Sequence, residues 1–299
     1  MNTRSVVITG ANAGLGLECA RAILETDPSA HVVLAVRDEK KGAAAVADLG
    51  APDRCTVLAC DLASLESVRA FPGVLAAAGL PPLHAVVCNA GLQMVSGLHM
   101  TADGVEMTFG VNHLGHFALI DGLVDHLATP ARVVVVASGT HDPKKFTGMP
   151  HPAYTSAEEL AHPRPGAAAD GRRRYTTSKL CNVLFAYELD RRLGHGARGI
   201  TVTAFDPGLM PASGLSRDYT PVQKAVWSVV SPVLRLLPNV NSVATSGGRL
   251  AALAVDPKFE QVTGEYFEGA KPIRSSADSY DPGKARDLWE TSEQLVTAR

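Results

Sequence analysis

The residues with the clearest chemical potential are Tyr175 and Lys179, in the sequence Tyr-Thr-Thr-Ser-Lys. Their spacing places a phenol and an ammonium group one turn apart on one face of a helix predicted over residues 176–193. A free phenol has a pKa of about 10 and transfers protons poorly near neutral pH unless a cation stabilises the phenolate. The pair therefore predicts general acid–base chemistry, and the alternative is an ordinary surface pair.

A glycine-rich segment over residues 9–16, Thr-Gly-Ala-Asn-Ala-Gly-Leu-Gly, follows the first predicted strand and opens the first predicted helix. Glycines in such a turn let the backbone approach a pyrophosphate, and the helix N-terminus offers free N–H groups. The spacing departs from the usual G-x-G-x-x-G, and the alternative is a tight strand-to-helix turn. Because strand, loop and helix are in register, we favour a dinucleotide site. Its members are Gly10, Asn12, Ala13, Gly14, Leu15 and Gly16.

Two further turns follow the third and fourth predicted strands. Asp61 and Leu62 would place a carboxylate beside an adenine amino group, and Asn89, Ala90 and Gly91 would offer a small-residue surface to a ribose. Either turn alone could be an ordinary one. Both lie at the C-terminal ends of strands, where open α/β sheets bind ligands, which favours cofactor binding.

The end of the second predicted strand bears on the choice of cofactor. Arg37 ends that strand, and Lys41 follows one helical turn later. A guanidinium pairs with a 2′-phosphate through two parallel hydrogen bonds, whereas an NAD site places a carboxylate there. We therefore expect NADP(H). The neighbouring Asp38 keeps NAD(H) as an alternative, and a solvated charged turn is a third interpretation.

The elements that must position these residues alternate between strand and helix. The apolar, β-branched runs are continuous, as in strands buried on both faces, and they cover residues 6–8, 31–36, 55–59, 85–88, 132–137 and 201–205. Helix-like stretches cover residues 16–26, 64–78, 107–127 and 176–193. This order predicts an α/β fold of one domain over residues 1–299, a Rossmann-type doubly wound parallel sheet with helices on both faces.

Two segments fall outside this alternation. Residues 141–174 are rich in Pro, Gly, His and Arg and predict a long loop, and loops of this length are more often functional or mobile than structural. The apolar, proline-punctuated stretch that begins at Leu209 predicts a small helical substrate lid over residues 209–240, with Leu209 and Trp227 facing substrate. Core packing or a subunit interface is an equal alternative for this stretch. A last helix, capped by Asp281, is expected to pack on the core.

Composition excludes several classes of protein. The chain has 299 residues, 46% of them hydrophobic, and a formal charge of -2, so it carries no basic field for nucleic acid. Five singly spaced cysteines indicate a reducing cytoplasm, and no apolar segment is long enough for a transmembrane span. Peripheral membrane contact through the lid, and the choice between a monomer and a homo-oligomer, stay open.

Other clusters of polar residues carry weaker signals. His113 and His116 lack a third ligand at metal-site spacing, so we expect no metal and expect both to pack in a helix or at a dimer face. The run Arg172-Arg173-Arg174 could meet an acidic group of a substrate, but a solvated charge run is the favoured interpretation.

Taken together, these segments make the sequence similar to the short-chain dehydrogenase/reductase family over nearly its whole length. The matching positions are residues 9–16, Asp61, residues 89–91, Asn112, Ser138, Tyr175, Lys179, Pro207 and Gly208. The resemblance implies that Pro207 and Gly208 belong to the cofactor site.

The resemblance also implies roles for four side chains. Tyr175 would be the general acid, and Lys179 would lower its pKa while holding the nicotinamide ribose. Ser138 would hydrogen-bond the substrate oxygen, and Asn112 would hold a water that connects Lys179 to solvent.

Residues 111–117, 178–182 and 284–293 resemble the branch that contains retinol dehydrogenases, the WW-domain oxidoreductase and light-dependent protochlorophyllide oxidoreductase. The resemblance implies an NADP(H)-dependent enzyme for a lipophilic aldehyde, ketone or alcohol. Thr140 and Cys181 fit the pattern of the photoenzyme, but Leu209 stands where that enzyme has a cysteine. Light-dependent protochlorophyllide reduction is therefore the second hypothesis, and a non-catalytic NADPH-binding sensor is the third.

Overall fold

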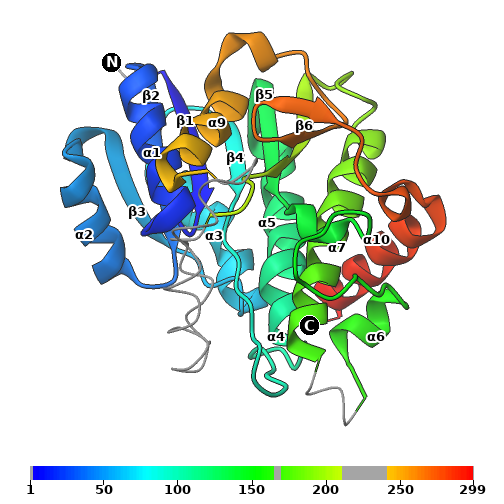
Figure 1. Ribbon diagram of the computed structural model, residues 1–299. Coiled ribbons are helices and arrows are strands. Elements are labelled where there is room, and N and C mark those ends of the chain that lie inside the picture. Colours follow the sequence, from blue (N-terminus) through cyan, green and yellow to red (C-terminus); the bar gives the residue numbers. More distant parts are fainter. Residues whose placement is uncertain (1–2, 165–169, 211–240, 299) are drawn as a thin grey trace, which may run out of the picture.

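The computed structural model describes residues 3–164, 170–210 and 241–298. One eight-stranded sheet runs through the molecule in the order β3-β2-β1-β4-β5-β6-β7-β8, and only β8 is antiparallel to its neighbour (Figure 1). The strands are β1 (Arg4–Thr9), β2 (Ala30–Val36), β3 (Cys55–Ala59), β4 (Leu83–Cys88), β5 (Leu127–Val136), β6 (Ile200–Asp206), β7 (Glu265–Glu268) and β8 (Lys271–Ile273). The order reverses at β1, so that the chain continues from β3 to β4 on the other side of β1, which is the doubly wound topology that the alternation predicts.

Helices cover both faces of the sheet. The α-helices are α1 (Gly14–Thr26), α2 (Glu39–Leu49), α3 (Leu65–Ala77), α4 (Met107–Phe109), α5 (Gly115–Leu123), α6 (Ala157–Ala161), α7 (Gly171–Arg192), α9 (Val243–Val255) and α10 (Pro282–Thr297). Alternate residues of β1 serve different cores: Val6 and Ile8 pack with the buried residues of α1 and α9, and Val7 packs with those of α3, α5 and α7. The continuous apolar runs therefore arise because each strand is covered on both faces.

The structure corrects several of the expected boundaries. The loop expected over residues 141–174 contains α6, and α7 already begins at Gly171. The stretch expected as one helix over residues 107–127 contains a π-helix at Gly110–Leu114 between α4 and α5, and Leu127 already belongs to β5. The strands β7 and β8 and the helices α2 and α9 are additional elements. The last helix is present as expected, because Asp281 accepts hydrogen bonds from the N–H groups of Gly283 and Lys284 at its first turn.

Within the described ranges, no helix combines the length and the apolar composition that crossing a bilayer requires. In the same part of the chain, no group of three or more His, Cys, Asp or Glu side chains is arranged to hold a metal ion.

Candidate active site

The glycine-rich turn presents the N-terminus of α1 at the carboxyl edge of the sheet. Ala13 is the N-cap residue in extended conformation, and it contributes no side-chain hydrogen bond to the helix. The first turn of α1 also contains no acidic residue. The N–H groups and the positive end of the helix dipole therefore lack the side-chain partner that a Ser or Asp cap would supply, and such an end suits an anionic ligand.

The glycine-rich turn is tied to the end of β4. The hydroxyl of Thr9 accepts hydrogen bonds from the N–H groups of Asn89 and Ala90, both at 2.9 Å. Nδ2 of Asn89 donates to the carbonyl of Thr9 at 2.8 Å, and a Cβ at Gly16 would lie 2.5 Å from that same Nδ2. Gly16 is therefore required by a close approach, and the two predicted cofactor segments form one unit.

The turn after β3 is locally ordered. Oδ1 of Asp61 accepts from the N–H of Ala63 at 3.0 Å, and the N–H of Asp61 donates to Ser67 Oγ at 2.9 Å. Leu62 is buried, and its carbonyl would lie 2.6 Å from a Cβ at Gly115. The structure thus places Asp61 at the carboxyl edge, as the sequence predicts, with Leu62 packed against the start of α5.

The charged residues after β2 separate into a capping pair and an exposed arginine. Asp38 caps α2 by accepting from the N–H of Lys41 at 3.1 Å, and Lys41 Nζ lies 3.5 Å from Asp38 Oδ2. Asp38 and Lys41 are therefore engaged with each other. Arg37 is exposed, and among the described residues it forms no ion pair.

Asn112 lies in the π-helix, where the N–H of Gly115 donates to the carbonyl of Gly110, five residues earlier. Its Oδ1 accepts from the N–H of Leu92 at 2.8 Å. Its Nδ2 donates to the carbonyl of Leu92 at 3.0 Å and to Ser178 Oγ at 2.9 Å. The side chain of Asn112 therefore joins the segment after β4 to α7. A π turn at this place matches the tendency of such turns to occur at functional sites.

Tyr175 and Lys179 lie in the first half of α7, and both side chains are buried. Lys179 Nζ donates to the carbonyl of Val136 at 3.2 Å and lies 5.7 Å from the centre of the Tyr175 ring. Burial lowers the pKa of Lys179 to about 8, and the Asp206 carboxylate partly opposes that shift. The helix thus holds a cation beside the phenol in a desolvated place.

Gly91 brings the two halves of the site together. A Cβ at Gly91 would lie 3.4 Å from Asn112 Oδ1 and 3.5 Å from Lys179 Nζ. The amide oxygen and the ammonium group therefore lie on the same side of this glycine, and a side chain at this position would stand directly against both.

The turn after β5 positions Ser138 and Thr140. Ser138 is the N-cap of a 3-10 turn, Gly139–His141, and its Oγ accepts from the N–H of Thr140 at 3.3 Å. This turn packs against α7, the helix that carries Tyr175. The hydroxyl of Thr140 is buried and has no hydrogen-bond partner among the described residues.

The segment after β6 is fixed by its own backbone contacts. Oδ1 of Asp206 accepts from the N–H of Gly208 at 2.9 Å, and the carbonyl of Pro207 accepts from Ser246 Oγ at 2.7 Å. Leu209, which follows, is 41% exposed. Trp227 and residues 211–240 of the expected lid lie outside the described residues.

The sequence does not predict the contact of His116 with Thr9 or the burial of Asp206. His116 Nε2 lies 2.8 Å from Thr9 Oγ1, so this histidine does more than pack in its helix. Asp206 is a buried carboxylate whose only signal in the sequence is its place before Pro207 and Gly208 at a strand end.

The interpretation of the arginine run as solvated is wrong for Arg174. Its Nε lies 3.1 Å from Oε1 of the buried Glu106. Arg172 and Arg173 are exposed. His113 packs as expected, among the rings of Phe109, Phe117 and Phe185.

Comparisons with known proteins agree with this geometry. The model of the short chain dehydrogenase family matches residues 4–157. The chain is 37% identical over 316 residues to protochlorophyllide reductase A of Oryza sativa subsp. japonica, with 97% of this chain and 80% of that protein covered. It is 35% identical over 304 residues to the WW domain-containing oxidoreductase of Danio rerio, with 100% of this chain and 70% of that protein covered.

Solved structures give the same result. An uncharacterized protein from Mycobacterium paratuberculosis superposes with a TM-score of 0.71 at 31% identity, covering 99% of this chain and 94% of that chain. The fold is also that of a metagenomic blue fluorescent protein in complex with NADPH, with a TM-score of 0.64 at 24% identity over 90% of this chain and 98% of that chain. The family model and the relatives that match nearly all of this chain confirm the resemblance, and the chain belongs to the short-chain dehydrogenase family of oxidoreductases.

Proposed function

We propose that the protein transfers a hydride between NADP(H) and a bulky lipophilic aldehyde, ketone or alcohol. The observation that carries this proposal is the buried pair of Tyr175 and Lys179 on α7, with Lys179 Nζ held by the carbonyl of Val136 two residues before Ser138. A phenol beside a buried cation can exchange a proton near neutral pH, which carbonyl reduction requires at the substrate oxygen.

The residues present fit a nicotinamide dinucleotide. The N-terminus of α1 offers N–H groups without a side-chain cap, which suits a pyrophosphate, and Gly16 lets this turn pack closely against Asn89. Because Gly91 has no side chain, Asn112 Oδ1 and Lys179 Nζ are not covered at this position, and we place the nicotinamide ribose against this glycine. When bound, the nicotinamide supplies or accepts the hydride.

Side chains of the protein transfer the proton that the substrate oxygen needs. In the direction of reduction, Tyr175 donates its hydroxyl proton to the substrate oxygen while Ser138 Oγ donates a hydrogen bond to that oxygen. The Lys179 ammonium stabilises the phenolate that remains, and a water beside Asn112 Oδ1 returns a proton from solvent. Oxidation of an alcohol follows the same path in reverse.

Arg37 supports NADP(H) over NAD(H). It is exposed at the end of β2, while the carboxylate of Asp38 is engaged in capping α2. An exposed guanidinium at this place suits a 2′-phosphate, and a carboxylate that is already a helix cap is less suited to the ribose hydroxyls of NAD(H).

The lipophilic substrate class rests on apolar residues at the substrate end. Leu209 is partly exposed directly after Gly208, and the sequence over 209–240 is apolar and includes Trp227. We assign this stretch the role of a substrate lid within a single domain, and we place Thr140 on the substrate side of Ser138.

Light-driven reduction of protochlorophyllide is the second candidate, because the relative from Oryza sativa, 37% identical over 97% of this chain, is named a protochlorophyllide reductase. Cys181, which fits the pattern of the photoenzyme, is fully buried in the core around α7, and burial raises the pKa of its thiol. Leu209 replaces the other cysteine. A photochemical reaction would therefore proceed without a thiol at either position, and we place it second.

The test is NADPH consumption in the dark with a panel of lipophilic aldehydes and ketones, retinal included. Tyr175→Phe keeps the ring and removes only the hydroxyl, so we expect turnover to fall roughly a hundredfold or more with the unfolding temperature unchanged. Unchanged turnover in this variant would exclude Tyr175 as the acid. Turnover of protochlorophyllide only under illumination would favour the photoenzyme, and NADPH binding without turnover in either assay would favour the sensor.

A further inference from the structure

His116 connects segments of the site that are far apart in the sequence. It is the second residue of α5, and its side chain is 1% exposed. Its Nε2 lies 2.8 Å from Thr9 Oγ1 at the end of β1, and its Nδ1 lies 3.1 Å from the carbonyl oxygen of Asn112. The ring therefore spans from the glycine-rich turn to the π-helix.

The hydrogen bonds at Thr9 define what Nε2 must do. A hydroxyl has one proton to donate and two lone pairs to accept with. Asn89 N–H and Ala90 N–H occupy both lone pairs. The hydroxyl proton is therefore what remains for His116, and Nε2 must accept it. The other acceptor near this hydroxyl, the carbonyl of Val87, is more distant at 3.4 Å.

The carbonyl of Asn112 defines the other nitrogen independently. A carbonyl oxygen only accepts, so Nδ1 of His116 must carry a proton and donate it. Burial, together with the charge of Lys179, lowers the pKa of His116 to about 4, so the ring is neutral at physiological pH. Both contacts thus require the same tautomer, with the proton on Nδ1.

These bonds close a ring around Gly91. Thr9 holds the backbone of residues 89 and 90, and Leu92, on the far side of Gly91, is held by the side chain of Asn112. His116 joins the backbone of Asn112 back to Thr9. The one residue enclosed, Gly91, is the one that faces Asn112 Oδ1 and Lys179 Nζ.

We propose that His116, as the neutral Nδ1–H tautomer, is a positioning residue that fixes the Asn89–Gly91 turn relative to Asn112 and so sets the affinity for the nicotinamide cofactor. The link to cofactor affinity rests on the proposed function. The link between His116, Thr9 and Asn112 does not depend on it.

Three substitutions separate the two contacts. His116→Asn keeps an amide near the place of Nδ1 and loses the contact with Thr9, His116→Gln keeps an acceptor near the place of Nε2 and loses the contact with Asn112, and His116→Phe loses both. Because the ring of bonds needs both contacts, we expect each variant to raise the dissociation constant for NADPH about tenfold or more, with Phe showing the largest effect.

His113→Gln is the matched control. His113 is one turn away with the same 1% exposure, but its Nε2 bonds to Ser292 Oγ in α10 and not to the cofactor turn. We expect this variant to lower the unfolding temperature and to keep the NADPH affinity within about twofold, as for an effect confined to packing. Equal losses of affinity in His113→Gln and His116→Gln would overturn the proposal.

A double-mutant cycle tests whether His116 acts through Thr9. Thr9→Val removes the hydroxyl at constant shape, and Thr9→Ser retains it. We expect Thr9→Ser to bind NADPH nearly as the original protein does, and the effects of Thr9→Val and His116→Phe to be strongly non-additive. Additive effects would show that the two residues act independently and would overturn the proposal.

The tautomer itself can be measured without any cofactor, from the ¹⁵N chemical shifts of His116 in labelled protein. We expect Nδ1 to be protonated and Nε2 to be unprotonated, with no change between pH 6 and pH 8. An Nε2–H tautomer, or titration within that interval, would overturn the ring of hydrogen bonds. Failure of the original protein to bind NADPH would instead refute the proposed function and the role of these hydrogen bonds in cofactor binding.

Discussion

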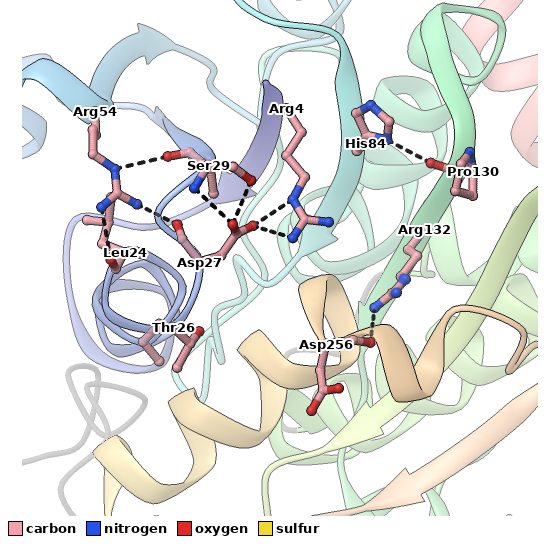
Figure 2. A network of polar contacts seen from close by, with 12 residues as sticks. Arg4, Leu24, Thr26, Asp27, Ser29, Arg54, His84, Pro130, Arg132 and Asp256 are labelled. Atoms are coloured by element: carbon pink, nitrogen blue, oxygen red, sulfur yellow. Dashed lines mark hydrogen bonds and ion pairs between the residues drawn. The ribbon is translucent and has the colours of Figure 1, made fainter. Parts of the chain in front are cut away.

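The two edges of the central sheet use opposite chemistry. At the amino edge, permanent charges meet the carbonyl ends of helices. Arg54 donates to the carbonyls of Leu24 at 3.0 Å and Asp27 at 2.7 Å, at the end of α1, and Arg132 Nη1 donates to the carbonyl of Asp256 at 2.8 Å, just after α9 (Figure 2). Arginines near helix C-termini satisfy the last carbonyls and oppose the negative end of the dipole.

The carboxyl edge leaves its groups open or neutral. The N-terminus of the same helix α1 has no side-chain cap, the buried His116 is neutral, and the buried Lys179 has a pKa lowered to about 8. At the amino edge, by contrast, Arg4 pairs with Asp27 at 2.6 Å. The amino edge therefore contributes stability, and the carboxyl edge retains partners for a ligand at some cost in stability.

The largest expected effect is that of Lys179→Met on turnover. Loss of the ammonium removes the cation beside Tyr175, so we expect kcat to fall roughly a hundredfold or more. The pKa of Lys179 is about 8 in the folded protein and 10.5 in its ordinary state. Between these values the unfolded chain binds more protons than the folded one, so burying this group lowers the free energy of unfolding most at pH 7 and below, where the group is charged in both states. The variant should therefore match or exceed the original protein in free energy of unfolding at pH 7, by a margin that shrinks toward pH 10. A variant that loses both activity and stability would break the contrast between the edges.

At the amino edge, Arg54→Met should have the reverse profile. The substitution removes three charge-assisted bonds to backbone carbonyls, including that of Ala30, while keeping much of the apolar stem. We expect the free energy of unfolding to fall by about 2 kcal/mol, with kcat and KM unchanged. Urea unfolding and steady-state kinetics on the same preparation measure both. A change in KM for NADPH as large as that caused by substitutions at the carboxyl edge would contradict the view that the amino edge contributes stability and the carboxyl edge binds the ligand.

The sequence predicts the carboxyl edge better than the amino edge, for a physical reason. The glycine-rich turn, the Asn89–Gly91 turn and the Tyr175–Lys179 pair each depend on local spacing, which a strand-turn-helix pattern or a single helical turn defines. The six predicted strands are also local signals, because strands buried on both faces are continuous apolar runs.

What the sequence does not predict depends on contacts between distant residues. The bond between Thr9 and His116 spans 107 positions, and the ion pair of Arg174 with Glu106 spans 68. The first contact needs β1 packed against α5, and the second needs the start of α4 packed against α7. The short edge strand β8 has three residues, too few for a periodic pattern, and it forms only because β7 supplies a partner.

Arg37→Leu gives a smaller effect that tests cofactor preference. Removing the guanidinium would delete two charge-assisted hydrogen bonds to a 2′-phosphate, so we expect the dissociation constant for NADPH to rise about tenfold and that for NADH to stay unchanged. Lys41→Met should raise the NADPH constant less than Arg37→Leu does, because Lys41 Nζ also lies 3.5 Å from Asp38 Oδ2. Equal weakening of NADPH and NADH by Arg37→Leu would remove Arg37 from phosphate recognition.

The smallest expected change is a shift in a pH profile on substitution of Asp206→Asn. The amide oxygen can still accept from the N–H of Gly208, so the turn is retained while the negative charge is lost. Because the Asp206 carboxylate raises the pKa of Lys179 against the effect of burial, its removal should move that pKa below 8. The step that needs the Lys179 ammonium is lost as pH rises through this pKa, so the basic limb of kcat/KM should move to lower pH while the rate near pH 6 changes little.

Glu268→Gln, at the end of the neighbouring strand β7 where Glu268 pairs with Lys145, is the control and should leave that limb in place. An unchanged limb in Asp206→Asn would show that the buried Lys179 keeps its charge without this carboxylate. The contrast with Arg4, which pairs with Asp27 at the amino edge, would then be larger.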